Sequence, residues 1–463
     1  MPFFKQASLA WMFVCSAHPS VAFFKVPCSS PLVIQRADPI VSPGVASNHV
    51  HTIMGGSGFG FTMNYDMTQT SKCNSCSAIE DKSNYWVAAL YYHAQNGSFH
   101  QVPQNGGALI YYEQRPDPST NGKIVAPPAG FRMIAGSPFD RSDKGTIETH
   151  ARSFACLNYN APGTPRLTCP NGIRAQVYFP SCWDGVNLDS PDHKSHMAYP
   201  TQDYDNGPCP ATHPVRIISI FIEVTWHTEQ FDDMWYGDKQ PFVFSFGDPT
   251  GYGIHGDFLN GWDVNVLQQA IDTCNDGGGD ITQCAPIHMQ PDWVTDGCIV
   301  ERSIDEQVDG WLDALPGCNP IQDGPGDAHV VTGCNAPTQI GQPLHYYTDL
   351  TSKGWQWMGC TRDNVGGVRV LTGSMAGISD MTPEKCVDVC NAAGYSIAGV
   401  ENQHECFCGN SLAGDMPTVT PMGNCLMTCA GDELQNCGGY GFIGLYQKCQ
   451  GNCNNLQYPV VPH

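Results

Sequence analysis

Short apolar runs, broken every few positions by Gly, Pro, Asn or Asp, make up most of the chain before residue 320. Runs of strand-like composition with turn residues at both ends predict β-strands at 108–112, 175–179, 216–224 and 241–246. The 216–224 run alternates imperfectly, as in a central, mostly buried strand. Long helical periodicity is rare, and 265–273 is one candidate. We therefore expect residues 23–318 to form a mainly β domain, a β-sandwich or jelly-roll-like fold with long loops.

Turn-forming residues dominate the next stretch, residues 319–352, which contains no run able to bury a core. We predict a linker or an extended strap here, and Cys318 and Cys334 are placed to tie part of it down. The alternative is that this stretch completes the first domain.

The first 22 residues have the pattern of a secretory leader. Lys5 gives the short start a positive charge, and the apolar run that follows is too short for a bilayer span, which needs about 20 residues. Small residues such as Ala17 and Ala22 fit signal-peptidase cleavage. No later stretch is apolar enough to be a membrane anchor. We expect a secreted, extracellular protein without a membrane anchor.

Cysteine usage agrees with secretion. The chain has 23 cysteines, and removing Cys15 with the leader leaves 22, an even number as full pairing requires. Disulfides persist in oxidising compartments, so we expect extensive bridging outside the cell. Asn96-Gly97-Ser98 is a sequon for N-glycosylation.

Charge narrows the class of partner. The formal net charge is −22, and only 14% of residues are charged. Such a surface repels phosphate backbones, so we expect no nucleic-acid partner. We expect the acidic balance to serve solubility, and we expect a monomer.

The cysteine spacing changes near the C-terminus. Eight cysteines lie between 360 and 437, at positions 360, 386, 390, 406, 408, 425, 429 and 437. Thr382, Pro383 and Glu384 have the pattern of a helix start, because they offer a side-chain cap, a first-turn proline and a favourable charge. Residues 442–446 have the composition of a strand.

These residues closely resemble a WSC domain. The family's order is Gly-Cys, a Cys-x3-Cys helix, Cys-x-Cys-Gly, a second Cys-x3-Cys and Cys-Gly-Gly before an aromatic strand, and every part is present. The resemblance implies a small disulfide-rich α+β module at 353–447, followed by a tail at 448–463. It also implies binding to cell-wall glycans, mainly β-glucan. Candidate sugar-stacking aromatics here are Trp355, Trp357, Tyr395, Phe407 and Tyr440.

The large domain holds three clusters of polar residues. His49 and His51 are two positions apart, so on a strand both side chains point to one face. Asp192, His193 and His196 lie in a loop-like stretch that begins at Cys182. The third cluster, residues 247–263, contains His255 and Asp257 among glycines that let a backbone approach a ligand.

These clusters resemble a fungal-type domain-of-unknown-function family, numbered nineteen-ninety-six. The shared segments are His-x-His-x3-Gly-Gly at 49–56, Ser-Asn-Tyr-Trp at 83–86, Cys-Trp-Asp-Gly with its histidines at 182–196, and Gly-Asp-Pro-Thr-Gly through His-Gly-Asp-Phe at 247–258. The resemblance covers about residues 23–300. The family name implies no activity.

The histidines allow three interpretations. Converging neutral imidazoles would bind a divalent metal, zinc or copper, and the candidate ligands are His49, His51, His193, His196 and His255. The second interpretation is that they bond only to loop backbones and aspartates, without any cofactor. In the third, Asp192 and Asp257 act as a carboxylate pair, or His51 or His193 as a base, in cleaving a polysaccharide as a hydrolase or lyase.

Aromatic residues accompany the polar clusters. Aromatic faces pack on the apolar surfaces of sugar rings, so these residues are candidate glycan contacts: Tyr85, Trp86, Trp183, Tyr252 and Trp262. Taken together, the sequence favours a secreted cell-wall protein that binds glycan through its WSC module and has a polysaccharide-cleaving large domain. A non-catalytic wall-binding or structural protein and a metal-dependent enzyme are the alternatives, so the sequence leaves enzyme status open.

Overall fold

The first of two facing sheets carries three of the four strands that the sequence predicts, those near 108–112, 175–179 and 216–224. The computed structural model describes residues 22–119, 122–159, 169–275, 278–333, 335–413 and 419–457. The leader lies outside these residues except for Ala22, as do Cys334 and the last six residues of the tail. In sheet order, the antiparallel strands of this sheet are β1 (Ala22–Cys28), β7 (Ala108–Gln114), β14 (Ser219–Trp226), β10 (Ile173–Tyr178) and β9 (Arg152–Cys156). The central strand, β14, is buried along nearly its whole length, as its imperfect alternation predicts.

The second sheet packs against the first. Its order is β2 (Val33–Gln35), β3 (His51–Gly55), β4 (Asn84–Ala88), β16 (His255–Leu259) and β8 (Arg132–Gly136). Side chains from both sheets, including Ile110 and Ile222 from the first and Met54 and Phe258 from the second, form one buried cluster. This is a β-sandwich, so the predicted fold class is confirmed.

Smaller elements surround the sandwich. A three-stranded sheet has the order β12 (Met197–Ala198), β11 (Cys182–Trp183) and β13 (Val215–Arg216). A four-stranded sheet has the order β15 (Phe242–Phe244), β5 (Leu90–His93), β6 (Phe99–Gln101) and β17 (Trp311–Leu312). The helices are α1 (Tyr65–Gln69), α2 (Ile147–His150), α3 (Val264–Thr273) and α4 (Asp292–Gly297), with 3-10 turns η1 (Thr228–Met234), η2 (Ile281–Gln283) and η3 (Pro316–Cys318). The predicted 265–273 helix corresponds to α3, which Asp263 caps by accepting from the amides of Asn265 and Val266. The predicted 216–224 run is divided between β13 and β14, which belong to different sheets.

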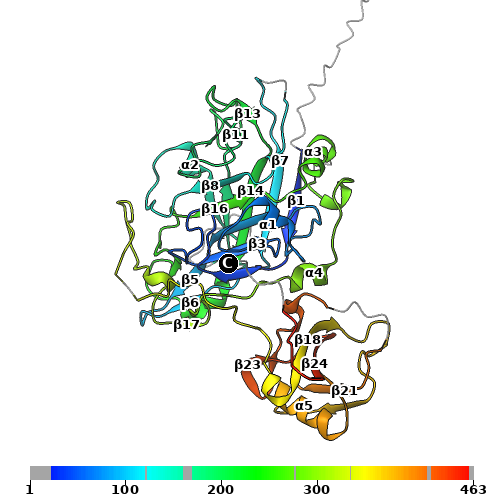
Figure 1. Ribbon diagram of the computed structural model, residues 1–463. Coiled ribbons are helices and arrows are strands. Elements are labelled where there is room, and N and C mark those ends of the chain that lie inside the picture. Colours follow the sequence, from blue (N-terminus) through cyan, green and yellow to red (C-terminus); the bar gives the residue numbers. More distant parts are fainter. Residues whose placement is uncertain are drawn as a thin grey trace, which may run out of the picture.

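The C-terminal module is a second body with its own core, coloured yellow to red beneath the sandwich in Figure 1. Its main sheet is β18 (Trp355–Arg362), β24 (Phe442–Lys448), β20 (Ile397–Glu401), β21 (Glu405–Gly409) and β19 (Ser374–Gly377), beside a hairpin of β22 (Thr428–Cys429) and β23 (Asp432–Asn436). Helix α5 (Pro383–Ala392) begins at Thr382, whose hydroxyl accepts from the Lys385 amide. The module also contains 3-10 turns η4 (Thr351–Lys353) and η5 (Met422–Cys425).

The segment predicted as a linker or strap lies along the sandwich for much of its length. The Gln322 carbonyl accepts from Arg141, the Ala328 amide donates to the Phe139 carbonyl, and the Leu344 amide donates to Arg302. Tyr347, near its end, stacks on Trp357 with ring centroids 5.4 Å apart and is part of the module core. The segment therefore makes ordered contacts with both bodies.

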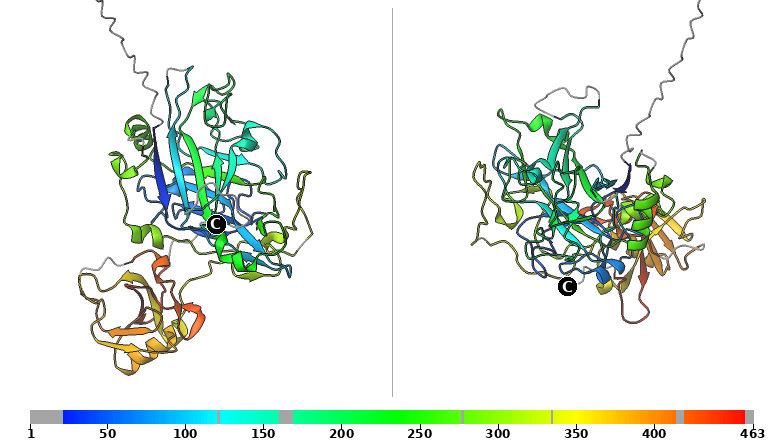
Figure 2. Two further views of the ribbon diagram at one scale, coloured as in Figure 1. Left: turned by 180° about the vertical axis from the view of Figure 1, so that it is seen from behind. Right: turned by 90° about the horizontal axis from the view of Figure 1, so that it is seen from above.

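Helix α4 lies where the two bodies meet (Figures 1 and 2). The Asn424 side-chain amide of η5 donates to the Trp293 carbonyl at 2.9 Å, and the Arg362 guanidinium lies 5.4 Å from the Trp293 ring centroid. Cys298, directly after α4, is disulfide-bonded to Cys73 of the sandwich. The helix is thus fixed to the sandwich on one side and contacts the module on the other.

Disulfides link strands and loops throughout both bodies. Among the described residues, the bridged pairs are Cys28–Cys76, Cys73–Cys298, Cys156–Cys169, Cys182–Cys209, Cys274–Cys284, Cys360–Cys425, Cys386–Cys406, Cys390–Cys408, Cys429–Cys437 and Cys449–Cys453. Cys318 is also disulfide-bonded. No helix within the described residues is both long and apolar enough to cross a bilayer.

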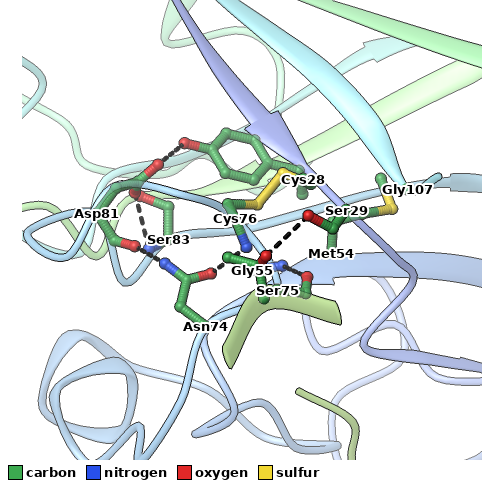
Figure 3. Close-up of a disulfide and its surroundings, with 12 residues drawn as sticks. Cys28, Ser29, Met54, Gly55, Asn74, Ser75, Cys76, Asp81, Ser83 and Gly107 are labelled. Carbon is green, nitrogen blue, oxygen red and sulfur yellow. Dashed lines mark hydrogen bonds between the residues drawn. A yellow bond between two sulfur atoms is a disulfide. The ribbon is translucent and has the colours of Figure 1, made fainter. Parts of the chain in front are cut away.

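The Cys28–Cys76 disulfide lies beside a buried polar cluster (Figure 3). Asn74 donates to the Asp81 carbonyl, and the Asp81 carboxylate accepts from the Ser83 amide at 3.0 Å and from the Tyr85 hydroxyl at 2.7 Å. Asp81 is fully buried, and burial raises its pKa to about 6. This cluster holds the loop before β4 against the sandwich.

Candidate functional site

Three of the predicted histidines converge on the outer face of the second sheet. His51 begins β3 and pairs with Ala88 of the intervening β4. His255 begins β16, where the next residue, Gly256, pairs with Val87 of β4, so the two histidines lie on the same face. His49 lies two residues before His51. One ring nitrogen from each of the three lies within 4.8 Å of the other two, and all three residues are buried.

Backbone carbonyls define the orientation of two of these rings. The Nδ1 atom of His51 lies 3.0 Å from the Ala37 carbonyl, and Nδ1 of His255 lies 3.0 Å from the Gly253 carbonyl. A carbonyl can only accept, so Nδ1 carries the proton in both rings and Nε2 presents a lone pair. Burial lowers the pKa of His51 and of His255 to about 3 and lowers that of His49 well below its usual range, so all three rings are neutral.

Two carboxylates lie close to the histidines. Asp257 is two positions after His255 on β16, so its side chain shares the face of the histidine cluster. It is buried, and neither carboxylate oxygen has a hydrogen-bond partner among the described residues. Burial raises the pKa of Asp257 well above its usual value. Asp38 is also buried with a raised pKa, and its Oδ1 accepts from the amides of Ile40 and Val41.

A cavity of about 280 Å³ opens onto this face. The strap closes one side with residues that include Asn319, Gln322 and His329. The titratable residues that line it are Asp38, His49, Arg141, Asp192, Lys194, His255, Asp257 and His329. The lining thus combines carboxylates, imidazoles and cations from segments far apart in the sequence.

Asp192 reaches the cavity from a loop that docks on the edge of β8. The Ile134 amide donates to the His193 carbonyl, and the Lys194 ammonium donates to the Gly136 carbonyl. Oδ1 of Asp192 accepts from the Ser195 amide at 2.9 Å and from the hydroxyls of Ser190 and Ser195. The Ser195 amide, followed by these hydroxyls, holds the pKa of Asp192 well below its usual range. The pKa of Asp192 is therefore lowered in the same cavity where burial raises the pKa of Asp257.

The remaining two histidines do not join the cluster. Nδ1 of His193 lies 2.8 Å from Asp189, and His193 does not line the cavity. His196 is buried between the Ser190 hydroxyl and the Arg132 carbonyl, with both ring nitrogens in hydrogen bonds. The wide set of candidate metal ligands is corrected to three, because these two rings serve to hold the 189–196 loop.

Burial corrects the predicted glycan contacts of the sandwich. Tyr85 and Trp86 of β4, and Trp262 after the end of β16, are fully buried. Trp183 is half-buried and donates its Nε1–H to the Asn187 carbonyl, while Tyr252 is 42% exposed. Of the five predicted contacts, only Trp183 and Tyr252 have surface exposed for a sugar.

Family comparisons agree with the division into two bodies. Residues 38–262 match the model of a domain of unknown function (DUF1996), and residues 357–439 match the WSC domain. The chain thus carries a DUF1996 domain at residues 38–262 followed by a WSC domain at residues 357–439. The histidine cluster and the cavity belong to the DUF1996 domain, apart from the strap residues.

Curated relatives match through about a quarter of this chain. It is 38% identical over 129 residues to a WSC domain-containing protein of Arthroderma benhamiae, covering 28% of this chain and 13% of that protein. It is 33% identical over 132 residues to Kremen protein 1 of Xenopus laevis and 30% identical over 133 residues to Kremen protein 2 of Homo sapiens. These matches cover 27% and 26% of this chain and 28% of each Kremen protein. The chain thus spans less than a third of these three relatives.

Two tryptophans predicted as glycan contacts are core residues of the WSC domain. Trp355 and Trp357 are each 3% exposed, and Trp357 packs between Tyr347 and Tyr446. Tyr440, in contrast, is 84% exposed in the turn before β24. The predicted stacking role is corrected for both tryptophans, and Tyr440 is left as the open aromatic surface.

A second group of metal-type ligands in the WSC domain is accounted for by disulfides. The sulfurs of Cys386, Cys390 and Cys406 lie close together. Each is oxidised in a bridge, Cys386 with Cys406 and Cys390 with Cys408. Bridged sulfurs are not thiolates, so they offer no zinc site.

Several residues that line the cavity were not predicted from the sequence. Asp38 lies in the same stretch as His49 and His51, and its position before a proline signals a turn rather than a site. Arg141 and Lys194 have no distinguishing spacing. The strap residues carry no local signal, because only the tertiary fold brings them over the second sheet.

Proposed function

We propose that the protein is a secreted, cell-wall-associated enzyme that cleaves a polysaccharide in the DUF1996 cavity, while its WSC domain binds β-glucan. The bridged cysteines support an extracellular location. The observation that supports the catalytic part is a pair of carboxyl groups in one cavity, Asp192 and Asp257, whose pKa values are shifted in opposite directions. Two carboxyl groups whose environments push their pKa values apart are suited to separate acid and base roles.

Each carboxyl group has a role that follows from its surroundings. Burial without a partner raises the pKa of Asp257 and favours its protonated form, which can donate a proton to a leaving glycosidic oxygen. Asp192 is held as an anion and can stabilise positive charge on the sugar or activate water. Lys194 and Arg141 also line the cavity, but each is paired with a carboxylate, Lys194 with Glu148 and Arg141 with Asp248. The lining therefore offers no unpaired positive charge from these two residues.

The first prediction concerns cleavage. The full chain is expected to release oligosaccharides from at least one member of a panel of fungal and plant glycans, measured as new reducing ends. Unsaturated products would identify a lyase and saturated products a hydrolase. Asp257→Asn is expected to lower the rate by about 100-fold or more, since positioned proton transfer contributes about 10²–10⁴-fold.

Asp184→Asn is the matched control for Asp192→Asn. Asp184 also caps a local turn, by accepting from the amides of Val186 and Asn187, but does not line the cavity. We expect Asp192→Asn to slow cleavage and Asp184→Asn to leave it unchanged. If no glycan yields products although the chain is retained on insoluble glucan, the protein is a non-catalytic wall-binding protein.

The second prediction concerns the WSC domain. Tyr440→Ala is expected to weaken binding of the full chain to β-glucan by about 2–10-fold, because an aromatic contact contributes about 0.5–1.5 kcal/mol. The measurement is depletion of the protein from solution by insoluble β-glucan. Leu434→Ala is the control, since Leu434 is 94% exposed on β23 but has no aromatic face. Equal losses in the two variants, or none in either, would contradict the role of Tyr440.

A further inference from the structure

The histidine cluster has a feature that acid–base chemistry in the cavity leaves unexplained. Nε2 of His51 is buried and has no hydrogen-bond partner among the described residues. A buried polar atom without a partner costs about 1–3 kcal/mol. Since Nδ1 of His51 already donates to the Ala37 carbonyl, the unpartnered atom is a lone pair. The His51 ring centroid lies 4.3 Å from that of His49 and 5.8 Å from that of His255.

The other two rings share one hydrogen bond, in which Nε2–H of His49 donates to Nε2 of His255. Nε2 of His49 and Nε2 of His255 lie 3.0 Å apart. His255 uses its Nδ1–H for the Gly253 carbonyl, so its Nε2 is also a lone pair. Phe246 covers both rings, with its centroid 5.3 Å from that of His49 and 5.2 Å from that of His255. Lone pairs from at least two rings therefore lie within one small volume that an apolar ring covers on one side.

We propose that His49, His51 and His255 bind one divalent first-row transition metal ion, zinc or copper. Neutral imidazoles are preferred ligands of both ions, and the cluster offers nitrogen donors without a thiolate. Two nitrogens bound tetrahedrally to zinc at about 2.0–2.1 Å lie roughly 3.3 Å apart, close to the spacing of His49 and His255. The carbonyls of Ala37 and Gly253 act as outer partners that orient two of the rings, a common arrangement around metal-bound histidine.

The position of the cluster leaves one side of the ion open. His49 and His255 line the cavity, and so does Asp257. Three protein ligands with an open fourth position distinguish a catalytic metal site from a closed structural one. The ion faces the sugar-sized cavity, where it can take a water or a substrate oxygen as its fourth ligand. This inference goes beyond the proposed function, because metal binding holds whether or not a glycan is cleaved.

The experiment measures metal content directly. The full secreted chain is purified, stripped with a chelator, dialysed separately against zinc and copper, and analysed by elemental mass spectrometry. We expect one ion per chain in at least one arm. In the copper arm, electron paramagnetic resonance is expected to show nitrogen hyperfine coupling, and chelation is expected to lower the thermal midpoint of the loaded protein.

Asparagine substitutions separate ligation from folding. His51→Asn and His255→Asn keep a side-chain donor near the Nδ1 position for the backbone carbonyl but remove Nε2. Both are expected to lose the ion and the chelator-dependent midpoint while keeping the circular dichroism of the stripped wild-type protein. His193→Asn, at a ring bonded to Asp189 outside the cluster, is expected to keep the ion.

The outcomes decide the proposal. A stripped wild-type chain that takes up neither zinc nor copper overturns it. Equal metal content in wild type and in the double variant His51→Asn/His255→Asn overturns it as well. Loss of the ion in His193→Asn overturns the three-ring assignment. If the Asn variants unfold, the nitrogen coupling of the copper-loaded wild-type protein still decides: coupling to imidazole nitrogens supports the site, and its absence overturns it.

Discussion

Arg141→Met is expected to lower the free energy of unfolding by about 3–5 kcal/mol, the usual cost of removing one partner from a buried ion pair. The Arg141 and Asp248 side chains are completely buried, with Nε 3.6 Å from the Asp248 carboxylate. Arg141 also donates to the carbonyls of Pro138, Asp140 and Gln322. Methionine has a similar length but leaves those carbonyls unpaired and the carboxylate buried without its counter-charge.

The measurement is urea unfolding of the sandwich, combined with limited proteolysis of the strap. Lys144→Met is the control, because the Lys144–Asp327 ion pair is much more exposed and such pairs contribute at most about 1 kcal/mol. The double variant Arg141→Met/Asp248→Asn is expected to recover part of the loss by removing the buried charge. An Arg141→Met protein as stable as the Lys144→Met protein would show that the ion pair does not hold the strap.

Asp81 is expected to make the sandwich less stable as the pH rises from about 4 to 6. Its pKa is raised by burial to about 6 in the folded protein, whereas an unfolded chain has a value of 3.8. Between these values the folded state holds a proton that the unfolded state releases, so stability falls with rising pH. At about 1.4 kcal/mol per pKa unit, the full change is about 3 kcal/mol, complete above pH 6.

Comparison with a neutral side chain isolates this effect. Asp81→Asn cannot titrate and keeps an oxygen for the Ser83 amide, so its stability relative to wild type is expected to rise by about 2 kcal/mol between pH 4 and 7. Denaturant unfolding at several pH values measures it. Asp305→Asn, at an exposed position, is the control and should follow the wild-type curve. A constant difference between Asp81→Asn and wild type would mean that Asp81 does not titrate in this range.

Local patterns predicted the elements of the fold well. The strands near 108–112 and 175–179 and the helix at 265–273 are visible in sequence because each has its own periodicity and turn residues. The family resemblances at both ends of the chain are confirmed. The order of strands in the sheets could not be predicted, because antiparallel neighbours such as β4 and β16 are far apart in the chain.

The candidate site could be predicted only in part, because its residues come from strands that are far apart in the chain. The spacing of His49 and His51 gives a shared face, but their meeting with His255 depends on β4 lying between β3 and β16. The aromatic contacts failed because β4 is buried on both faces, so alternation cannot separate an exposed tryptophan from a core one. Ser195 lies three positions after Asp192 and donates its amide to the Asp192 carboxylate. This spacing is typical of local capping and could have indicated that Asp192 has a lowered pKa.

The attachment of helix α4 has a consequence for how the two domains would share a substrate. Because α4 is bridged to the sandwich through Cys298 and contacts η5 through Asn424, the distance from Tyr440 to the cavity does not vary as it would on a loose tether. If both domains bind one glycan, as proposed, only polymers long enough to reach across that span would gain affinity from double attachment. Shorter oligosaccharides would contact one domain at a time, so affinity would depend on chain length.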